Sequence, residues 1–184
     1  MVDVHPNAWV SPHAVLRGDI TLGAGARVLD FAVLDGSRGP VRIGSDVVVM
    51  EHALVRARDD HPVVIGDAVL VGPHTHVNGA RVEDEVFIAT GAALFPGSRA
   101  GAGSELRIHS VLQVNSRLAP GTVVPIGWIA AGDPAALFAP GQHEELWAVQ
   151  RELDFPGTVY GVDRGTSMRE MMRLQSARYG PDPS

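Results

Sequence analysis

Four residues near the middle of the chain, Glu51, His52, His74 and His76, are of types that perform chemistry. Imidazole nitrogens bind zinc or nickel, and a histidine beside a carboxylate can act as a general acid–base pair. His74 and His76 are two residues apart, so an extended strand would project both side chains on one side. The sequence therefore offers His52, His74 and His76 as a candidate metal-binding set, within one subunit or across two, and Glu51 as a candidate catalytic partner. The alternative, which we favour, is that these histidines occupy turns, where they are solvated or fill an interface.

The elements that must position these residues follow from an aliphatic residue that recurs at nearly every sixth position. This period matches neither the helical repeat nor simple alternation, and a short fixed period indicates a repeat architecture. Glycine follows several of these residues, as in Leu22-Gly23, so each hexad is expected to be a short strand and a turn. Stacked hexads would bury the aliphatic residues in one continuous core. The series is Val10, Leu16, Leu22, Val28, Leu34, Ile43, Val49, Val55, Ile65, Val71, Val77, Val82, Ile88, Leu94, Ala100, Leu106, Leu112, Leu118 and Val124.

This pattern resembles the hexapeptide-repeat proteins, whose chain winds as a left-handed parallel β-helix with three hexads in each triangular coil. The resemblance implies an all-β solenoid. His52 and His74 each follow a member of the aliphatic series by three residues, so both are expected at one corner, a coil apart. Trp9 is expected to cover the open end of the first coil, where strand edges are unpaired.

Two segments, residues 35–40 and 57–62, interrupt the period. If three hexads form a coil, both segments leave the stack at the same corner. We therefore expect two neighbouring surface loops, which are the usual place for function on a rigid scaffold. His61 lies in the second segment and carries the same two interpretations as the other histidines.

The chain is expected to divide into a β-helix domain, residues 1–136, and a C-terminal helical extension, residues 137–184. Residues 142–153 are predicted to form an α-helix, because its apolar residues share one face. Residues 154–165 contain one proline and three glycines and are predicted to be an extended connector. Ser167 and Glu170 have the spacing of a capping box, which opens a second predicted helix. That helix is expected to run to about Tyr179 and to end at Gly180 and Pro181.

The composition excludes several classes of function. The chain has no cysteine, which removes disulfides and thiolate chemistry, and no lysine, which removes Schiff-base catalysis. All 15 basic residues are therefore arginine, which we attribute to a GC-rich bacterial genome. The net charge is −6 and no basic stripe is visible, so nucleic acid is not an expected partner. No apolar run is long enough to span a membrane and the first residues show no secretory signal, so we expect a cytoplasmic protein.

A closer resemblance rests on four short segments. They are Ala8-Trp9-Val10, Ile43-Gly44-Ser45, Pro62-Val63-Val64-Ile65-Gly66 and Gly132-Asp133-Pro134-Ala135. Through them residues 8–136 resemble the γ-class carbonic anhydrases among the hexapeptide-repeat proteins. The resemblance implies a homotrimer that binds zinc between subunits through three histidines, two from adjacent coils of one subunit and one from its neighbour.

The positions that match the family's zinc-binding histidines carry Arg56, Pro73 and Asn78. Arginine stays protonated, proline has no side-chain donor and asparagine is a poor zinc ligand. The family's active-site glutamine matches Met50, and the aspartate beside it matches Glu51. We therefore expect neither the family zinc site nor carbonic anhydrase activity, and we expect no cofactor.

The family's Arg-Gly-Asp motif matches Asp35-Gly36-Ser37, whereas Arg17-Gly18-Asp19 of this chain falls one coil earlier. Asp35, Arg56 and Asn78 are expected at equivalent outward positions on three successive coils. Asp35 is expected to form an ion pair with Arg56, and Arg56 a hydrogen bond with Asn78. One interpretation is a polar ladder that fills the old metal pocket and holds a trimer interface. The other is a pocket for a small anion, such as a carboxylate or bicarbonate, recruited by Arg56. The candidate binding residues are Asp35, Arg56, Asn78, Met50, Pro73 and His61.

Two further classes of function stay open. Many hexapeptide-repeat proteins transfer acyl groups from coenzyme A or acyl carrier protein, by a mechanism that resembles general-base catalysis by one interface histidine. In this chain that histidine would be His52, His61, His74 or His76, although no long acceptor-binding loop is visible. A non-catalytic scaffold, in contrast, would bind no ligand and would tolerate replacement of the histidines.

Overall fold

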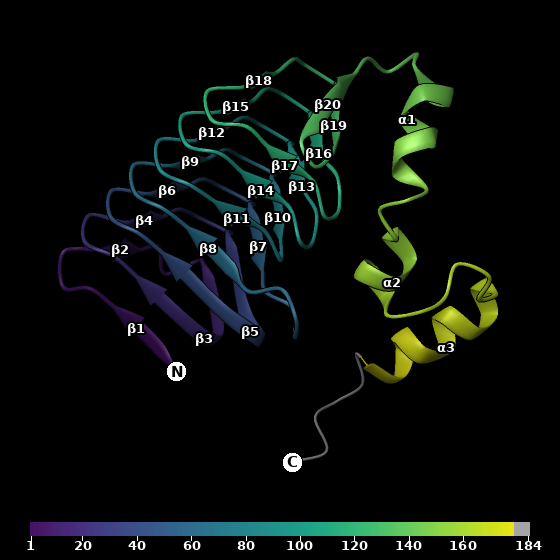
Figure 1. Cartoon of the computed structure of the whole chain (residues 1–184). Coiled ribbons are helices and arrows are strands. Elements are labelled where there is room, and N and C mark those ends of the chain that lie inside the picture. Colours follow the sequence, from purple (N-terminus) through teal and green to yellow (C-terminus); the bar gives the residue numbers. More distant parts are fainter. Residues whose placement is uncertain (179–184) are drawn as a thin grey trace.

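The computed structural model describes residues 1–178. It shows a parallel β-solenoid of about seven turns followed by three helices (Figure 1). The strands of each turn stack in parallel register on those of the turn before, so that the sheets run the length of the solenoid. The six-residue period of the sequence therefore corresponds to the strand-and-turn units that were predicted from it.

The strands form three faces that the chain visits in a fixed order. The first face is the seven-stranded sheet of β2 (Trp9–Val10), β4 (Arg27–Val28), β6 (Val48–Val49), β9 (Leu70–Val71), β12 (Phe87–Ile88), β15 (Glu105–Leu106) and β18 (Val123–Val124). The second face holds the first halves of β3 (Val15–Leu22) and β5 (Val33–Ile43), then β7 (Leu54–Arg56), β10 (His76–Asn78), β13 (Ala93–Leu94), β16 (Val111–Leu112) and β19 (Ile129–Gly132). The third face holds β1 (Val2–Val4), the second halves of β3 and β5, β8 (Val63–Ile65), β11 (Arg81–Val82), β14 (Arg99–Ala100) and β17 (Arg117–Leu118).

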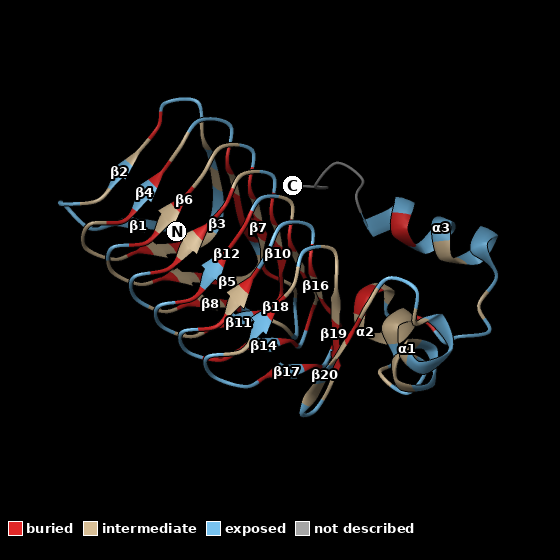
Figure 2. Ribbon diagram, turned by 90° about the horizontal axis from the view of Figure 1, so that it is seen from above, coloured by how far each residue is buried: buried red, intermediate tan, exposed pale blue. Residues whose placement is uncertain are grey.

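The core consists of the aliphatic series, which lies in lines along the inside of the solenoid. Leu34, Ile88 and Leu112 are fully buried, and only the first members of the series, Val10 and Leu16, are partly buried. Neighbouring residues along each strand point outward because strand side chains alternate. Figure 2 shows this arrangement as buried segments that recur from turn to turn, separated by exposed corners. One coil cannot bury its own aliphatic residues, so the stack is the smallest stable unit.

The first interruption of the period is not a loop, contrary to the prediction. Residues 35–40 belong to β5, which pairs with β7 on the second face and with β8 on the third, and so passes around the corner without a break. Residues 57–62 form a turn closed by an antiparallel bridge between Arg58 and His61. The two segments are neighbours, as predicted, because Arg38 Nε donates to Asp59 Oδ1 at 3.2 Å. Pairing with β3 supplies hydrogen bonds to β5 on both sides of this corner, and the extra residues of β5 are accommodated where the register shifts between Gly18 and Ile20 of β3.

The two ends of the solenoid differ from the prediction. Trp9 is 48% exposed in β2 and does not cover the first coil, whose edge is extended by β1 pairing with β3. At the other end, β19 turns back into β20 (Ala135–Phe138), which pairs with it in the antiparallel direction. From the sequence alone, residues 126–134 are expected to form only a last strand and an exit turn, so the returning strand β20 is an addition to that expectation. The hairpin ends the parallel stack and leads the chain into the helices.

The C-terminal helices follow the solenoid back toward its N-terminal end (Figure 1). They are α1 (His143–Gln150), α2 (Phe155–Tyr160) and α3 (Met168–Arg178). The prediction of an extended connector at residues 154–165 was wrong, since α2 lies within it. Asp154 caps this helix by accepting from the Gly157 backbone at 3.2 Å, and Pro156 stands in the first turn, where a missing N–H costs nothing.

The predicted capping box of α3 is half formed. Ser167 Oγ accepts from the Glu170 backbone N–H at 3.2 Å, but the Glu170 carboxylate accepts from Arg173, with Nη2 at 2.7 Å, instead of reaching back. The predicted end of this helix at Tyr179, Gly180 and Pro181 lies outside the described residues. No helix within residues 1–178 has both the length and the apolar character needed to cross a membrane.

Candidate functional site

A polar ladder on the second face joins three successive coils. Arg17 of β3, Asp35 of β5 and Arg56 of β7 are register partners on adjacent parallel strands. Arg17 Nη2 donates to Asp35 Oδ2 at 2.8 Å, and Arg56 Nε donates to the same oxygen at 3.3 Å. The predicted ion pair between Asp35 and Arg56 is therefore present, and a second arginine shares its carboxylate.

The carboxylate of Asp35 is the centre of this ladder. Its side chain is only 11% exposed, and its second oxygen accepts from the Ser37 backbone N–H at 3.1 Å. Burial alone would raise the pKa of Asp35, but the hydrogen bonds from Arg17 and Ser37 outweigh it and lower the pKa to about 2. One negative charge thus faces two arginines, and the ladder carries a net charge of about +1 at neutral pH.

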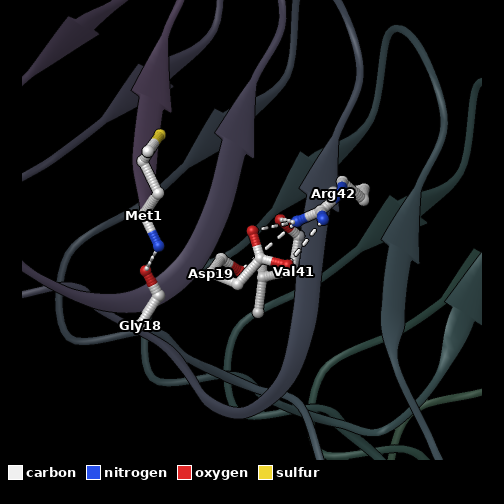
Figure 3. Close-up of polar contacts among 5 residues, drawn as sticks. All are labelled: Met1, Gly18, Asp19, Val41 and Arg42. Carbon is white, nitrogen blue, oxygen red and sulfur yellow. Dashed lines mark hydrogen bonds and ion pairs between the residues drawn. The ribbon is translucent and has the colours of Figure 1, made fainter.

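Arg17-Gly18-Asp19 does not match the family motif and so has no predicted place in the site, which the structure corrects in part. The segment does lie one coil before Asp35, as predicted, but Arg17 belongs to the ladder. Asp19 turns to the third face and forms a two-point ion pair with Arg42, whose Nη1 and Nη2 donate at 3.0 and 2.7 Å (Figure 3). The signal that could have identified Arg17 was its position eighteen residues before Asp35, which is one regular coil.

Asn78 continues the ladder on the next coil, opposite Arg56 in register. The predicted hydrogen bond to Arg56 is absent, because Asn78 Oδ1 is buried and has no partner within the described residues. Arg56 instead points its Nε at Asp35, which fits the greater strength of a hydrogen bond to a charged acceptor. A second unpartnered atom, Nε2 of His76, is buried on the same strand. Burial lowers the pKa of His76, and the nearby charges of Arg56 and Arg58 lower it further, so its ring is neutral at pH 7.

Aromatic side chains border this end of the ladder. The ring of Phe95 meets His76 edge-on with centroids 6.3 Å apart, and Phe155 of α2 contacts Phe95 at 5.4 Å. Arg58 Nη2 donates to the Val159 carbonyl oxygen and so attaches α2 to the turn beside the ladder. Sequence reasoning missed these residues, because α2 was not predicted and nothing in the hexad pattern distinguishes Phe95 from other outward residues.

The corner between the first and second faces carries a column of stacked rings. The imidazoles of His52 and His74 are parallel within 1°, with centroids 4.9 Å apart. Phe31 stacks on His52 at 5.2 Å, and His13 on Phe31 at 5.6 Å. The prediction that His52 and His74 share a corner one coil apart is confirmed. Phe31, His52 and His74 all have positive φ, so each occupies the tight turn of its coil.

The candidate metal set and the candidate acid–base pair are not assembled within the single chain. His76 lies on the second face against Phe95, away from the stacked pair. Within residues 1–178 there is no group of three or more His, Cys, Asp or Glu side chains that could hold a metal ion. Glu51 meets the next coil through its backbone, since its carbonyl oxygen accepts from the His74 N–H at 3.1 Å. In the described part of the chain no side-chain hydrogen bond joins Glu51 to His52.

The remaining candidates lie on other faces. Met50 and Pro73 line a mainly apolar groove of about 450 Å³ on the first face, next to Phe87 and Ile126, which are 43% and 63% exposed. His61 lies at the corner between the second and third faces and lines a different groove of about 270 Å³. The single chain therefore does not bring Met50, Pro73 or His61 together with Arg56 in one pocket.

These features define the class of protein. The triangular coils match the crystal structure of a hexapeptide transferase family protein from Anaplasma phagocytophilum, with a TM-score of 0.54 at 19% identity over 95% of this chain and 92% of that one. The predicted fold, a left-handed parallel β-helix with C-terminal helices, is confirmed. No family model matches the chain.

Sequence relatives narrow the class. The chain is 30% identical over 149 residues to gamma carbonic anhydrase 1, mitochondrial, of Arabidopsis thaliana, an alignment that covers 78% of this chain and 52% of the relative. It is 24% identical over 114 residues to the carnitine operon protein CaiE of Escherichia coli, covering 62% of this chain and 58% of CaiE. The chain thus spans about half the length of the curated relatives it matches. The chain is gamma carbonic anhydrase-like in its sequence and a hexapeptide-repeat β-helix in its fold.

Proposed function

We propose that the protein is a homotrimer without the family's zinc site or carbonic anhydrase activity, and that its polar ladder forms an interface pocket for a small anion. Donor chemistry supports the first part. Catalytic zinc needs three protein ligands drawn from histidine, cysteine and carboxylates, and the three matching positions hold Arg56, Pro73 and Asn78. Arg56 is moreover engaged by Asp35. These side chains do not fit zinc, so no zinc-activated water is expected at this position.

The observation that carries the anion pocket is a single carboxylate shared by two arginines. Asp35 Oδ2 accepts from both Arg17 and Arg56, and the side chain of Arg56 is 30% exposed. Of the guanidinium nitrogens of Arg56, only Nε has a hydrogen-bond partner within the described residues. The remaining N–H groups and the net positive charge favour a small anion, because arginine binds planar oxyanions through paired donors.

Bicarbonate fits the neighbouring atoms better than a simple carboxylate does. It carries anionic oxygens that can accept from Arg56 and a hydroxyl that can donate to the buried, unpartnered Oδ1 of Asn78. Acetate has the first group and lacks the second. A buried acceptor left without a donor is costly, so a ligand that supplies the donor gains affinity.

The alternative function of the ladder is to stabilise the trimer. In that case side chains of a neighbouring subunit, and not an anion, would contact the ladder. The exposed apolar residues of the groove beside Met50 and Pro73 favour association, because contiguous apolar surface is typical of an interface. The trimer itself is implied by the family resemblance. Sedimentation equilibrium of the full chain tests it, and a monomer at micromolar concentration would contradict it.

The decisive experiment has two parts. Protein purified without an affinity tag is expected to contain no stoichiometric zinc and to show no carbon dioxide hydration above the buffer control. Calorimetric titration is expected to detect bicarbonate binding that exceeds acetate binding and is lost in Arg56→Gln. Arg27→Gln, an exposed arginine on the first face, is the matched control and is expected to bind normally. Stoichiometric zinc with hydration activity would overturn the proposal, and equal bicarbonate affinity in Arg56→Gln would leave the ladder only its trimer-stabilising function.

A further inference from the structure

Three arginines form a row on the third face, away from the polar ladder. Arg81 of β11, Arg99 of β14 and Arg117 of β17 are direct register partners on adjacent parallel strands. All three are exposed. Adjacent strands are roughly 4.8 Å apart, so the row spans roughly 10 Å. Like charges at opposing positions destabilise a sheet, and the row therefore requires compensating negative charge.

The protein supplies only part of that charge. Glu83 Oε1 accepts from Arg99 Nε at 2.7 Å, and Asp133 Oδ2 lies 3.8 Å from Arg117 Nε. Arg81 has no ion pair within the described residues. Three positive charges thus face two carboxylates, and the carboxylate of Asp133 is beyond hydrogen-bond distance of Arg117. The row keeps a net positive charge that a bound anion could neutralise.

The row borders a preformed groove of about 270 Å³. At its corner side, Gly79 and Gly97 have positive φ and no side chain. A Cβ on Gly79 would lie 2.7 Å from the Cβ of His61, and a Cβ on Gly97 would lie 3.4 Å from its Cε1. Gly79 therefore makes room for His61 at the wall of the groove, and Gly97 makes room first for the Asn115 side chain and then for the His61 ring. His61 and the three arginines line the same groove.

The edge of the groove is held in place by the C-terminal segment. Asn115 Nδ2 donates to the Leu153 carbonyl oxygen at 3.0 Å and to Thr158 Oγ1 at 2.9 Å. These bonds join the wall of the groove to the chain on both sides of the start of α2. A groove whose wall is hydrogen-bonded in this way loses little freedom when a ligand enters, which favours binding.

We propose that this groove binds a pyrophosphate group, with the guanidinium groups of Arg81, Arg99 and Arg117 contacting its oxygens and His61 at one end. Guanidinium groups bind phosphate oxygens with two parallel hydrogen bonds. One carboxylate could neutralise a single member of the row. A pyrophosphate carries several charges along its length and can bridge neighbouring members. The site lies on a different face from the polar ladder, so it stands independently of the proposed anion pocket there.

The test is a calorimetric titration of the full chain with inorganic pyrophosphate at low ionic strength, since salt screens exposed charges. We expect binding that is weakened at least about tenfold in Arg81→Gln/Arg117→Gln. Orthophosphate is expected to bind more weakly than pyrophosphate. The matched control is Arg42→Gln, which lies in the same column of the third face two coils earlier, outside the groove. It is expected to bind pyrophosphate like the unmodified protein.

Three results would overturn the proposal. They are no pyrophosphate binding by the unmodified protein, unchanged affinity in the double variant, and an equal loss in Arg42→Gln. The thermal midpoint of each variant shows whether it is folded. Because these arginines are exposed, their replacement is expected to leave the fold intact. Parallel titrations with ADP and coenzyme A identify the source of the group. Tighter binding of either, lost in the double variant, would support the proposal and assign the pyrophosphate to a nucleotide or to the coenzyme.

Discussion

Replacing Asp35 by asparagine removes the one negative charge that holds two arginines of the ladder together. The pKa of Asp35 is lowered from 3.8 to about 2 in the folded protein, and each pKa unit corresponds to roughly 1.4 kcal/mol. The side chain is only 11% exposed, so solvent screening reduces this little. We therefore expect Asp35→Asn to lose about 2 kcal/mol of unfolding free energy at pH 7. For a chain of this length that is a fall of roughly 4–8 °C in the thermal midpoint.

The lowered pKa of Asp35 also determines how its contribution to stability changes with pH. Because the folded pKa lies below the unfolded one, the stabilisation is fully present above about pH 4 and is lost as the pH falls toward about 2. Urea unfolding at a fixed protomer concentration, repeated at descending pH, should show the two proteins converging in that window. Asp19→Asn is the matched control, since Asp19 stands in the neighbouring strand β3 and pairs with Arg42 in an exposed ion pair, which contributes little. An equal loss in the two variants, or a difference that persists unchanged near pH 2, would refute the reasoning.

Three further predictions concern the ladder and the corner beside it. Arg56→Ala is expected to weaken the proposed trimer, because the ladder carboxylate keeps only one arginine partner. A dissociation midpoint that equals that of the unmodified protein, when both are diluted and run on size-exclusion chromatography, would contradict this. Burial lowers the pKa of His76, so the folded chain resists the proton that the unfolded chain takes up, and stability should fall as the pH drops below about 6.5. His76→Gln should flatten that fall in urea midpoints between pH 7 and pH 5, whereas parallel profiles would show that another group causes it. Gly79→Ala should lose about 1–3 kcal/mol more than Gly103→Ala, because both have positive φ but only the first would meet a neighbouring side chain, and equal losses by calorimetry would argue against that clash.

Much of the solenoid could be predicted because its cause is local and repeated. An aliphatic residue at every sixth position, followed by a turn, buries itself only against the same residue of the next coil. The order of faces and the shared corner of His52 and His74 follow from that spacing. The continuous β5, the hairpin of β19 and β20, and helix α2 do not. Their stability comes from partners distant in the sequence. Pro156, Gly157 and Gly161 together resemble a linker, and only the structure shows that Asp154 caps a helix at this place.

The candidate site divides in the same way. Sequence spacing was enough to pair Asp35 with Arg56, because register on adjacent coils is set by the period. The period also placed Arg17 one coil before Asp35, but only the structure showed that its side chain turns to the same oxygen. Nothing in the sequence revealed that Asn78 and His76 keep buried atoms without partners.

The sequence by itself determined which residues lie opposite one another, since a fixed repeat converts position in the chain into position on a face. Only the tertiary structure decided which of these neighbours bond. A side chain on a coil can turn toward the coil before it, the coil after it or the helices beside it, and the choice depends on charge, burial and competing partners at once. That competition sent Arg56 to Asp35 rather than to Asn78. It also left the arginines of the third face in a row with too few carboxylates.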